Sequence, residues 1–432
     1  MNSVPKHIAE TIQDQAEPNW YIYDLWVMNT KMDALACLPG KVETFYAMKV
    51  NPHVEVVTNA LNHENIRGIE VASAWEIEVV QQAWEQDLSK VIYTWPGKKR
   101  EELQISVDWN IRYLNVESLR EAIVTDMIAK QRNVMQPILL RLNSKHAFWK
   151  WEAWVTLWSG STQFWVPQDD AVRTLRQLEQ LENLKVDGFH VYPATWVMSA
   201  EVLLWSVERT FQDVVSIEKE VWKTFKTIDF WGGFWIDYGW NTQFNIQAYS
   251  IWLQKLIEKY DMQDRVFLLE LGRFLWADMW YYFTKITDIK QVGIVEPQTM
   301  WQIAWTILEN WQKIWEIIKW VICEAGTNWH KRPQVLWVDY HIEVLEWESA
   351  QRKYIEEMMM KLWWEVPQVL QDELFNVYGS FCTSVDFLAK WVRWKVARIW
   401  DFIVMPQSGA YWKSMSPQQF LSHPEVAEIV IK

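Results

Sequence analysis

The sequence is short of glycine and cysteine. It holds 13 glycines in 432 residues, whereas the average usage of about 7% would give about 30. Its three cysteines, Cys37, Cys323 and Cys382, lie far apart and form no CxxC pair. This spacing argues against a disulfide framework and against a zinc knuckle. We therefore expect a protein of the reducing cytoplasm.

Long hydrophobic runs and basic clusters are also missing. No run of about 18 apolar residues occurs to span a bilayer, and residues 1–15 contain no apolar stretch typical of a signal peptide. The formal net charge is -13, whereas binding to phosphate backbones or anionic lipids needs clustered Lys and Arg. We therefore expect no nucleic-acid partner and no membrane partner.

The residues that are present indicate two folded domains. Half of them are hydrophobic and 22% are charged, and the length suits two domains better than one. Between residues 41 and 280, short β-rich runs alternate with longer helical patterns. The runs lie at 44–50, 66–73, 90–94, 111–116, 138–143, 186–192, 227–230 and 266–270. About eight strands with intervening helices predict an α/β fold, a (β/α)8 TIM barrel.

The pattern changes after residue 280. Strand-like stretches at 281–290, 321–326, 334–346 and 397–405 follow one another with few helices. They predict a second, mainly β domain made of residues 1–40 and 281–432. The YIYDL segment near residue 22 is expected to add a strand to it.

One lysine lies at the carboxyl end of the first predicted barrel strand, in YAMKVN at 46–51. Barrel enzymes keep their catalytic groups at these ends, although position alone more often means a solvated charge. A lysine that forms a Schiff base must lose its proton near neutral pH. A partly desolvated barrel mouth beside another cation promotes that loss.

Five further motifs follow Lys49 along the chain. They are GFHVYPAT at 188–195, DFWGGFW at 229–235 with ELGR at 270–273, GSFCTSVD at 379–386, and SGAY at 408–411. A glycine pair lets backbone N–H groups approach a phosphate closely, but alone it is usually a turn. Glu270 could equally form a structural ion pair with an arginine.

In this order the motifs resemble those of the fold-type III pyridoxal 5'-phosphate (PLP) decarboxylases, the diaminopimelate/ornithine decarboxylase family, whose barrel is alanine-racemase-like. YAMKVN resembles the PLP-lysine motif YAxKxN, and DFWGGFW resembles the loop GGGFG. ELGR, GSFCTSVD and SGAY resemble EPGR, GPxCESxD and GAY. The resemblance runs from about residue 21 to about residue 430.

The resemblance implies roles for individual residues. Lys49 would hold PLP as a Schiff base, Cys382 of the partner subunit would donate a proton after decarboxylation, and Glu270 would pair with the pyridine nitrogen. Further cofactor contacts would come from Arg141, His190, Tyr192, Thr195, Gly232, Gly233, Gly272, Arg273 and Tyr411. Substrate contacts would come from Arg273, Arg332, Thr383 and Asp386. Because these motifs come from two subunits in the family, we expect a homodimer with shared active sites.

The substrate is less constrained than the family. Diaminopimelate decarboxylases place Glu after the cysteine, where this chain has Thr383, and a Tyr of their Arg-Pro-x-x-Tyr motif is here Leu336. The stretches 160–165 and 414–428 resemble a branch that acts on carrier-tethered or otherwise modified amino acids. We expect α-decarboxylation of an L-amino acid or amino-acid derivative through Lys49, with the substrate either a free small molecule or tethered to a carrier protein. Diaminopimelate decarboxylase is the alternative.

Two readings from other classes stay open. An amino-acid racemase on the same barrel would need a catalytic Tyr opposite the lysine, and the order of motifs fits decarboxylases better. A catalytically inactive regulatory homologue would be favoured if the tryptophans of the loop are real.

Tryptophan is as abundant as glycine is scarce, with 34 residues. Several stand where the family has glycine, namely Trp75, Trp165, Trp231, Trp235 and Trp412. An indole in the loop would block the approach of a phosphate and would strain any position that needs a positive φ. Our hypothesis is that many of these tryptophans are encoded by UGA codons, which the source organism reads as glycine. Trp20, outside the motifs, is expected to be genuine.

Overall fold

The computed structural model of the chain contains two compact units. One comprises Met1–Asp24, Tyr238–Trp240 and Asp278–Lys432, and the other comprises Leu25–Asp237 and Asn241–Ala277. The structure describes residues 4–14, 19–83, 88–143, 166–167, 170–191, 197–236, 243–292, 318–324, 341–347, 350–362, 368–370, 373–380, 386–393, 396–408, 413, 416 and 425–432.

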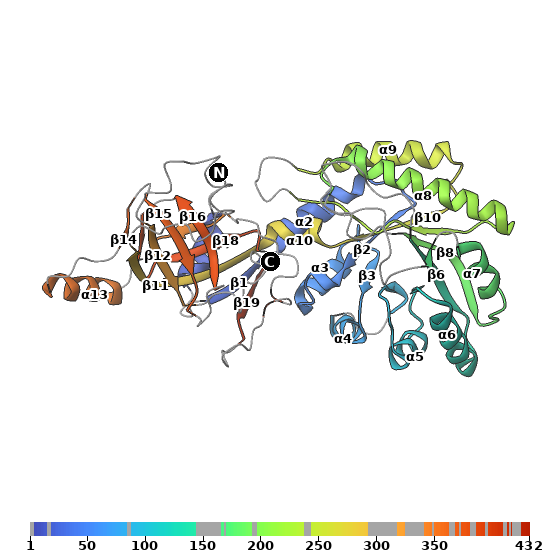
Figure 1. Cartoon of the computed structure of the whole chain (residues 1–432), viewed down its shortest axis with the longest axis horizontal. Coiled ribbons are helices and arrows are strands. Elements are labelled where there is room, and N and C mark those ends of the chain that lie inside the picture. Colours follow the sequence, from blue (N-terminus) through green and yellow to red (C-terminus); the bar gives the residue numbers. More distant parts are fainter. Residues whose placement is uncertain are drawn as a thin grey trace, which may run out of the picture. The chain divides into compact units, whose positions relative to one another are not determined.

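The second of these units is a closed parallel barrel of eight strands (Figure 1). The strands pair in the order β2-β3-β4-β5-β6-β8-β9-β10, and β10 pairs with β2 to close the circuit. They are β2 (Val42–Ala47), β3 (Gly68–Val71), β4 (Val91–Tyr93), β5 (Tyr113–Val116), β6 (Gln136–Asn143), β8 (Leu184–Val191), β9 (Thr227–Asp229) and β10 (Val266–Leu271), with β7 (Val166–Pro167) paired to β6. Every predicted run became a strand, which confirms the TIM barrel.

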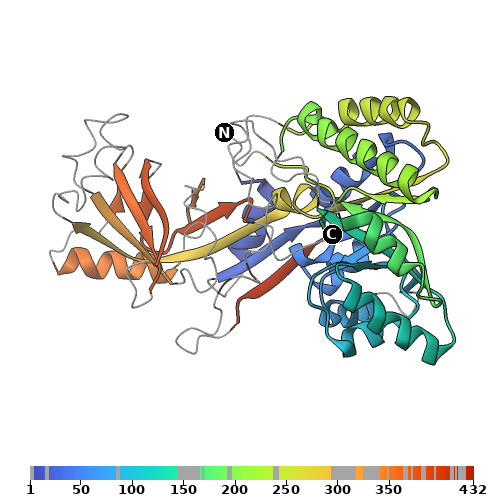
Figure 2. The same ribbon diagram turned by 45° about the vertical axis from the view of Figure 1, so that its right-hand side comes forward.

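Helices surround the barrel strands, as Figure 2 shows from a second side. They are α2 (Leu25–Asp33), α3 (Val54–Asn62), α4 (Ala74–Ala83), α5 (Arg100–Asp108), α6 (Leu119–Arg132), α7 (Ala171–Leu178), α8 (Ala200–Val221), α9 (Ile246–Lys259) and α10 (Arg273–Trp276), with the 3-10 turns η1 (Ala34–Cys37), η2 (Met48–Val50), η3 (Leu88–Lys90) and η5 (Ala277–Met279). Three begin at side-chain caps, because Ser118, Ser199 and Asn245 accept hydrogen bonds from backbone N–H groups three residues later.

The barrel interior is filled by side chains from different strands. Phe45, Ile92, Tyr113, Leu139 and Leu268 form one buried cluster. They come from β2, β4, β5, β6 and β10, so five strands contribute to a single packed core. The strands are buried on both faces, which explains why they read as nearly continuous apolar runs.

The other unit is mainly β. Its large sheet has the order β13-β18-β11-β12-β15-β16, and β1 pairs with both β11 and β19. The elements are α1 (Lys6–Asp14), β1 (Asn19–Asp24), β11 (Trp280–Val292), β12 (Ile318–Cys323), β13 (Glu343–Leu345), α13 (Ala350–Lys361), β14 (Gln368–Val369), β15 (Leu374–Tyr378), β16 (Phe387–Arg393), β17 (Ala397–Arg398), β18 (Phe402–Pro406) and β19 (Ala427–Ile431). The mainly β character is confirmed, and the YIYDL segment forms β1.

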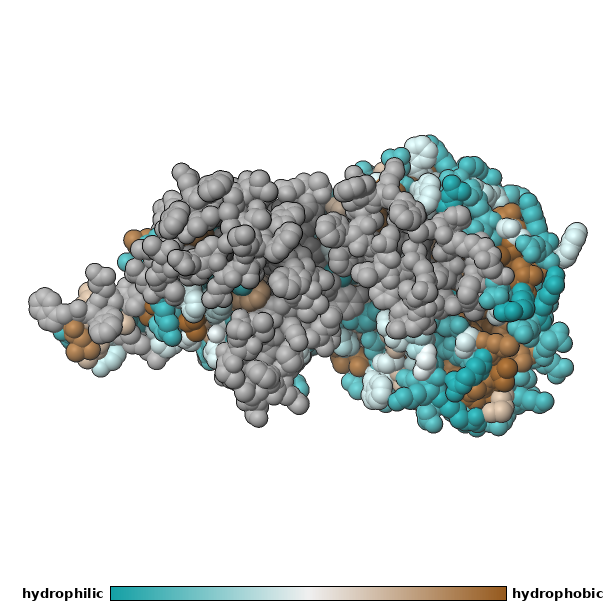
Figure 3. All heavy atoms as spheres, in the orientation of Figure 1, coloured by the Kyte–Doolittle hydropathy of each residue, from teal (hydrophilic) through white to brown (hydrophobic). Residues whose placement is uncertain are grey.

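The barrel unit begins earlier than the predicted residue 41. It starts at Leu25, because α2 packs against α10 and η1 packs against α9. Where Figure 3 colours its surface, that surface is largely hydrophilic with scattered apolar side chains. Within the described ranges, no helix is both long enough and apolar enough to cross a bilayer.

Candidate active site at the carboxyl end of the barrel

Polar side chains gather where the parallel strands end. Lys49 follows β2 in η2, Glu70 lies on β3, and Arg141, His190 and Glu270 lie on β6, β8 and β10. The register places Arg141 beside His190, and His190 beside the Asp229 that ends β9. Because the carboxyl ends of parallel strands meet at one end of a barrel, residues far apart in sequence form one site.

Lys49 is paired with a buried carboxylate. Its Nζ forms an ion pair with Glu70, whose side chain is fully buried, and the Lys49 side chain keeps 14% of its surface exposed. Burial raises the pKa of Glu70 to about 7, although the Lys49 charge opposes that rise. Glu70 can therefore take up and release a proton beside the Lys49 amine near neutral pH. Sequence reasoning missed Glu70, and its only signal is an acidic residue within an apolar strand.

Glu270 lies in a polar pocket with unused hydrogen-bonding capacity. Thr94 Oγ1 donates to Glu270 Oε1 over 3.2 Å, and Asn115 Nδ2 donates to Thr94 Oγ1 over 2.7 Å. The second oxygen, Glu270 Oε2, is buried and has no hydrogen-bond partner among the described residues. Burial raises the pKa of Glu270, and the positive charge of Lys49 lowers it less strongly.

His190 lies next to Glu270 and is neutral. Its Nε2 is 3.7 Å from Glu270 Oε1, and neither ring nitrogen has a hydrogen-bond partner within the described part of the chain. Burial, and then the positive charges of Arg141 and Lys49, hold the pKa of His190 well below its ordinary value. Buried polar atoms without partners are rare in proteins, so this pocket is suited to a polar ligand.

Asp229 adds a second buried carboxyl group. Burial, and then the charge of Glu270, raise the pKa of Asp229 well above its usual range. One ligand atom each from His190, Asp229 and Glu270 lies within 4.8 Å of the others. The cluster could therefore hold a cation, either a metal ion or a protonated ring nitrogen.

Arg141 is held by a residue that sequence reasoning did not single out. Its guanidinium forms an ion pair with Glu117, and both side chains are buried. Between β4 and α5, buried Lys98 donates to Glu121 Oε1 of α6 over 2.5 Å and to the Asn115 carbonyl of β5 over 2.8 Å. Arg141 is therefore paired with a buried carboxylate.

The glycine pair lies against β10. A Cβ on Gly232 would be 2.5 Å from the Glu270 carbonyl oxygen, and Gly233 has a φ of +79°. The Glu270 N–H donates to the carbonyl of Trp231 over 3.0 Å. These positions therefore require glycine.

Gly272 and Arg273 start α10. A Cβ on Gly272 would be 2.3 Å from Val50 Cγ2, so close approach to the segment after Lys49 also requires glycine here. The Arg273 guanidinium carbon lies 4.4 Å from the centroid of the Trp235 ring.

The remaining predicted site residues are either part of the β unit or outside the described residues. Asp386 is buried in the β unit, where its carbonyl accepts a hydrogen bond from the Gly379 N–H over 3.0 Å. Six others lie outside the described residues: Tyr192, Thr195, Arg332, Cys382, Thr383 and Tyr411.

The barrel matches a known protein family. Residues 27–277 match the family described as "Pyridoxal-dependent decarboxylase, pyridoxal binding domain". This chain belongs to the pyridoxal-dependent decarboxylases. The match covers more than half of the sequence and includes every polar residue of the site described above. The predicted family, the PLP cofactor and the carboxy-lyase class are thereby confirmed.

Curated relatives match over nearly the whole chain. A 2-[(L-alanin-3-ylcarbamoyl)methyl]-2-hydroxybutanedioate decarboxylase of Staphylococcus aureus is 25% identical, with 96% of this chain and 95% of the relative covered. An L-glutamyl-[BtrI acyl-carrier protein] decarboxylase of Niallia circulans is 23% identical, with 96% and 89% covered. The structure of diaminopimelate decarboxylase from Helicobacter pylori has the same fold, with a TM-score of 0.78 at 19% identity over 98% of this chain and 94% of that one.

The polar residues of the barrel suit PLP. Lys49 offers a primary amine, Glu270 has a free carboxylate oxygen, and His190 has two free ring nitrogens. A protonated ring nitrogen would supply the positive charge that a buried carboxylate needs. The indole of Trp231, whose ring centroid is 4.2 Å from Lys49 Nζ, does not suit the cofactor.

Proposed function

We propose that the cluster at the carboxyl end of the barrel removes the α-carboxylate of an L-amino-acid derivative. The observation that carries this proposal is the pairing of Lys49 with buried Glu70 next to the unsatisfied polar atoms of Glu270 and His190. When bound, PLP supplies the electron sink that accepts the bonding pair left by departing carbon dioxide.

The chain's own residues prepare the lysine. Glu70 can exchange a proton with Lys49 Nζ, with which it forms an ion pair, since burial raises the pKa of Glu70 to about 7. The amine of Lys49 is then free to hold the cofactor. Neutral His190 would lie beside the cofactor ring without adding a charge, and Glu270 would hold the ring nitrogen.

The remaining contacts are assigned from the family resemblance. Phosphate would be bound by Gly232, Gly233, Gly272, Arg273, Thr195 and Tyr411. The ring would stack on Tyr192, and its phenolic oxygen would face Arg141. The substrate would contact Arg273, Arg332, Thr383 and Asp386.

The substrate is proposed to be a modified or carrier-tethered amino acid rather than diaminopimelate. The printed names of two curated relatives describe such compounds, an alanin-3-yl group carried by a hydroxybutanedioate and a glutamyl group on an acyl-carrier protein. Thr383 also replaces the Glu that diaminopimelate decarboxylases use for the far amino group.

The test is a comparison of substrates with carbon dioxide release as the readout. The panel contains diaminopimelate, free lysine, ornithine and glutamate, glutamyl acyl-carrier protein, and an alanin-3-yl amide of a hydroxy acid. We expect kcat/KM to be highest for one of the last two. A preference for diaminopimelate would overturn the substrate proposal and leave the family unchanged.

We further propose a cytoplasmic homodimer in which Cys382 of one subunit donates the proton that replaces carbon dioxide at the α-carbon. Cys382→Ala should still release carbon dioxide, but protonation should shift to another carbon and give transamination products. Mixed chains of Lys49→Ala and Cys382→Ala should form the correctly protonated amine product at roughly a quarter of the wild-type rate, because half the dimers are mixed and each has one complete site. No recovery would contradict shared sites.

A further inference from the structure

The indole of Trp231 lies among the side chains that would contact the cofactor. Its ring centroid is 4.2 Å from Lys49 Nζ and 5.6 Å from the Arg141 guanidinium carbon. The His190 ring packs against it edge-on, with centroids 5.5 Å apart. Lys49, Arg141 and His190 come from three different parts of the barrel, so Trp231 lies in the middle of the site.

This position conflicts with binding of the cofactor. A pyridine ring held by Lys49 and Glu270 needs the volume next to the Lys49 amine, and two rings cannot share it. The Trp231 backbone has little freedom to withdraw, because its N–H donates to Asp229 Oδ1 over 2.9 Å and its carbonyl accepts from the Glu270 N–H over 3.0 Å.

The backbone at Trp231 also disfavours any side chain. Its φ is +61°, in the left-handed region where glycine is preferred and where a bulky aromatic residue is an outlier. Gly232 and Gly233 follow directly. The backbone conformation at residue 231 therefore favours glycine, at the same position where the indole fills the site.

Two tryptophans outside the site show the same conflict. Among the described residues other than glycine, φ is positive at Asn110, Asn133, Trp222, Trp231, Asp261, Trp400 and Gln407. Asn and Asp tolerate this region, but Trp does not. Trp222 has a φ of +55° at the carboxyl cap of α8 and is 94% exposed. Glycine is the usual residue at such a cap.

The solvent exposure of other tryptophan side chains is also unusual for this residue type. Tryptophan is normally well buried, yet Trp26, Trp75 and Trp252 are each more than half exposed on barrel helices. None of these three side chains is in the candidate site. The mismatch between tryptophan and its surroundings is therefore spread over the barrel rather than confined to one loop.

We propose that residue 231 is glycine in the working enzyme, and that Trp222 and Trp400 are glycine as well. The printed tryptophans would arise from codons that the source organism reads as glycine. Glycine at 231 opens the space between Lys49, Arg141 and His190 and removes the strain at φ +61°. The assignment of 231 as the residue that admits the cofactor rests on the proposed function, whereas the assignments of 222 and 400 rest on the backbone alone.

The direct test is peptide mass spectrometry of the protein from its native source. Peptides that span residues 222, 231 and 400 should carry glycine at all three positions, with Trp20 retained as tryptophan. Tryptophan at 231 would overturn the proposal. This result does not depend on activity, so it can fail while the proposed function stands.

The second test compares variants of the printed chain in an ordinary host. Trp231→Gly should bind PLP at least about tenfold more tightly than the printed chain, and borohydride reduction should then fix a pyridoxyl group on Lys49 that peptide mass detects. Trp222→Gly is the matched control, since it relieves the same backbone strain on an exposed cap. It should raise Tm and leave PLP binding as weak as in the printed chain.

Trp20→Gly is the opposite control. Trp20 packs against a buried cluster of the β unit, so this change should lower Tm. Equal PLP binding by the printed chain and Trp231→Gly would overturn the proposal. So would a lower Tm of Trp222→Gly. If the printed chain is insoluble, the mass spectrum decides.

Discussion

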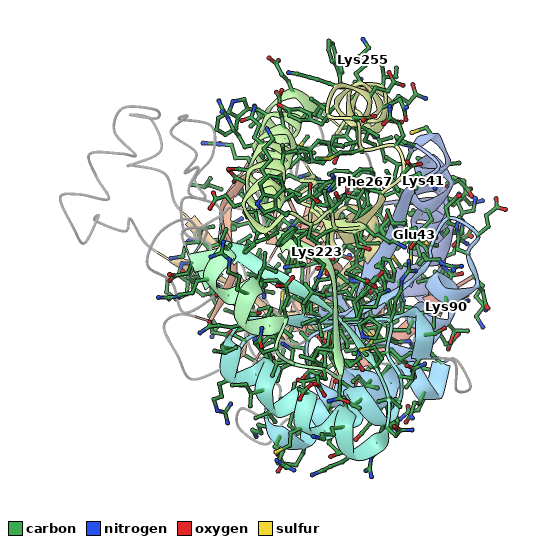
Figure 4. All side chains as sticks on the ribbon, turned by 90° about the vertical axis from the view of Figure 1, so that its right-hand side faces the viewer. Lys41, Glu43, Lys90, Lys223, Lys255 and Phe267 are labelled. Carbon is green, nitrogen blue, oxygen red and sulfur yellow. The ribbon has the colours of Figure 1, made fainter. Side chains whose placement is uncertain are left out.

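The charged side chains at the two ends of the barrel differ in how deeply they are buried. At the amino end, Lys41, Glu43, Lys90 and Lys223 lie near the starts of strands (Figure 4). The Glu43 and Arg112 side chains pair over 2.5 Å there, with 26% and 19% of their surfaces exposed. At the carboxyl end, the Lys49–Glu70 and Arg141–Glu117 pairs and the His190–Glu270 contact are all largely or fully buried.

This difference in burial indicates that the active site lies at the carboxyl end. A partly exposed ion pair adds or costs little stability, whereas each buried charge is costly unless it is well paired. The carboxyl end buries several such groups in one place and shifts the pKa values of Glu70, Asp229, Glu270 and His190. Clusters of shifted pKa values are typical of active sites.

The largest expected difference between the two ends is in activity. Lys49→Ala should lower kcat/KM by at least about 1000-fold and abolish cofactor attachment, because the Lys49 amine is the group assigned to hold the cofactor. Lys41→Ala, at the amino end of the same strand, should leave both unchanged. Circular dichroism checks that both variants fold. Full activity of Lys49→Ala would remove the basis of the site.

The next difference is in stability. Glu117→Gln should lower the free energy of unfolding by about 3 kcal/mol, because Arg141 loses its carboxylate in a buried setting. Glu43→Gln should change it by less than about 1 kcal/mol, since its pair with Arg112 is partly exposed. Urea unfolding of the two variants measures both values. Equal effects would mean that the two ends do not differ as described.

The smallest expected effect is on pH dependence. The native pKa of Glu70 is raised to about 7, above an unfolded value of about 4.3. The native chain therefore binds more protons than the unfolded chain between these pH values, so the free energy of unfolding falls as pH rises through this window, by roughly 1–3 kcal/mol.

Unfolding without cofactor at pH 4.5 and pH 8 measures this term. Glu70→Gln should flatten the profile, whereas Glu43→Gln should keep the slope. An unchanged slope in Glu70→Gln would show that other groups carry the pH dependence.

The fold was largely predictable from the sequence. Each apolar run between 44 and 270 became a barrel strand, and the YIYDL segment became β1. Lys49 was predicted at a strand end and follows β2. Such local patterns suffice because strand and helix periodicities are set by neighbouring residues. Glu70, Glu117 and Asp229 were missed, because an acidic residue in an apolar strand gives no sign of which distant residue it meets.

The sequence by itself determined the order of strands and helices, the position of Lys49, and the imbalance between tryptophan and glycine. Only the tertiary structure decided that Glu70 meets Lys49, that His190 and Glu270 share one pocket, and that Trp231 lies among Lys49, Arg141 and His190. The physical reason is barrel closure, which brings the carboxyl ends of eight strands together and buries charges there. Proximity and burial, and the pKa shifts they cause, depend on distances that no local pattern encodes.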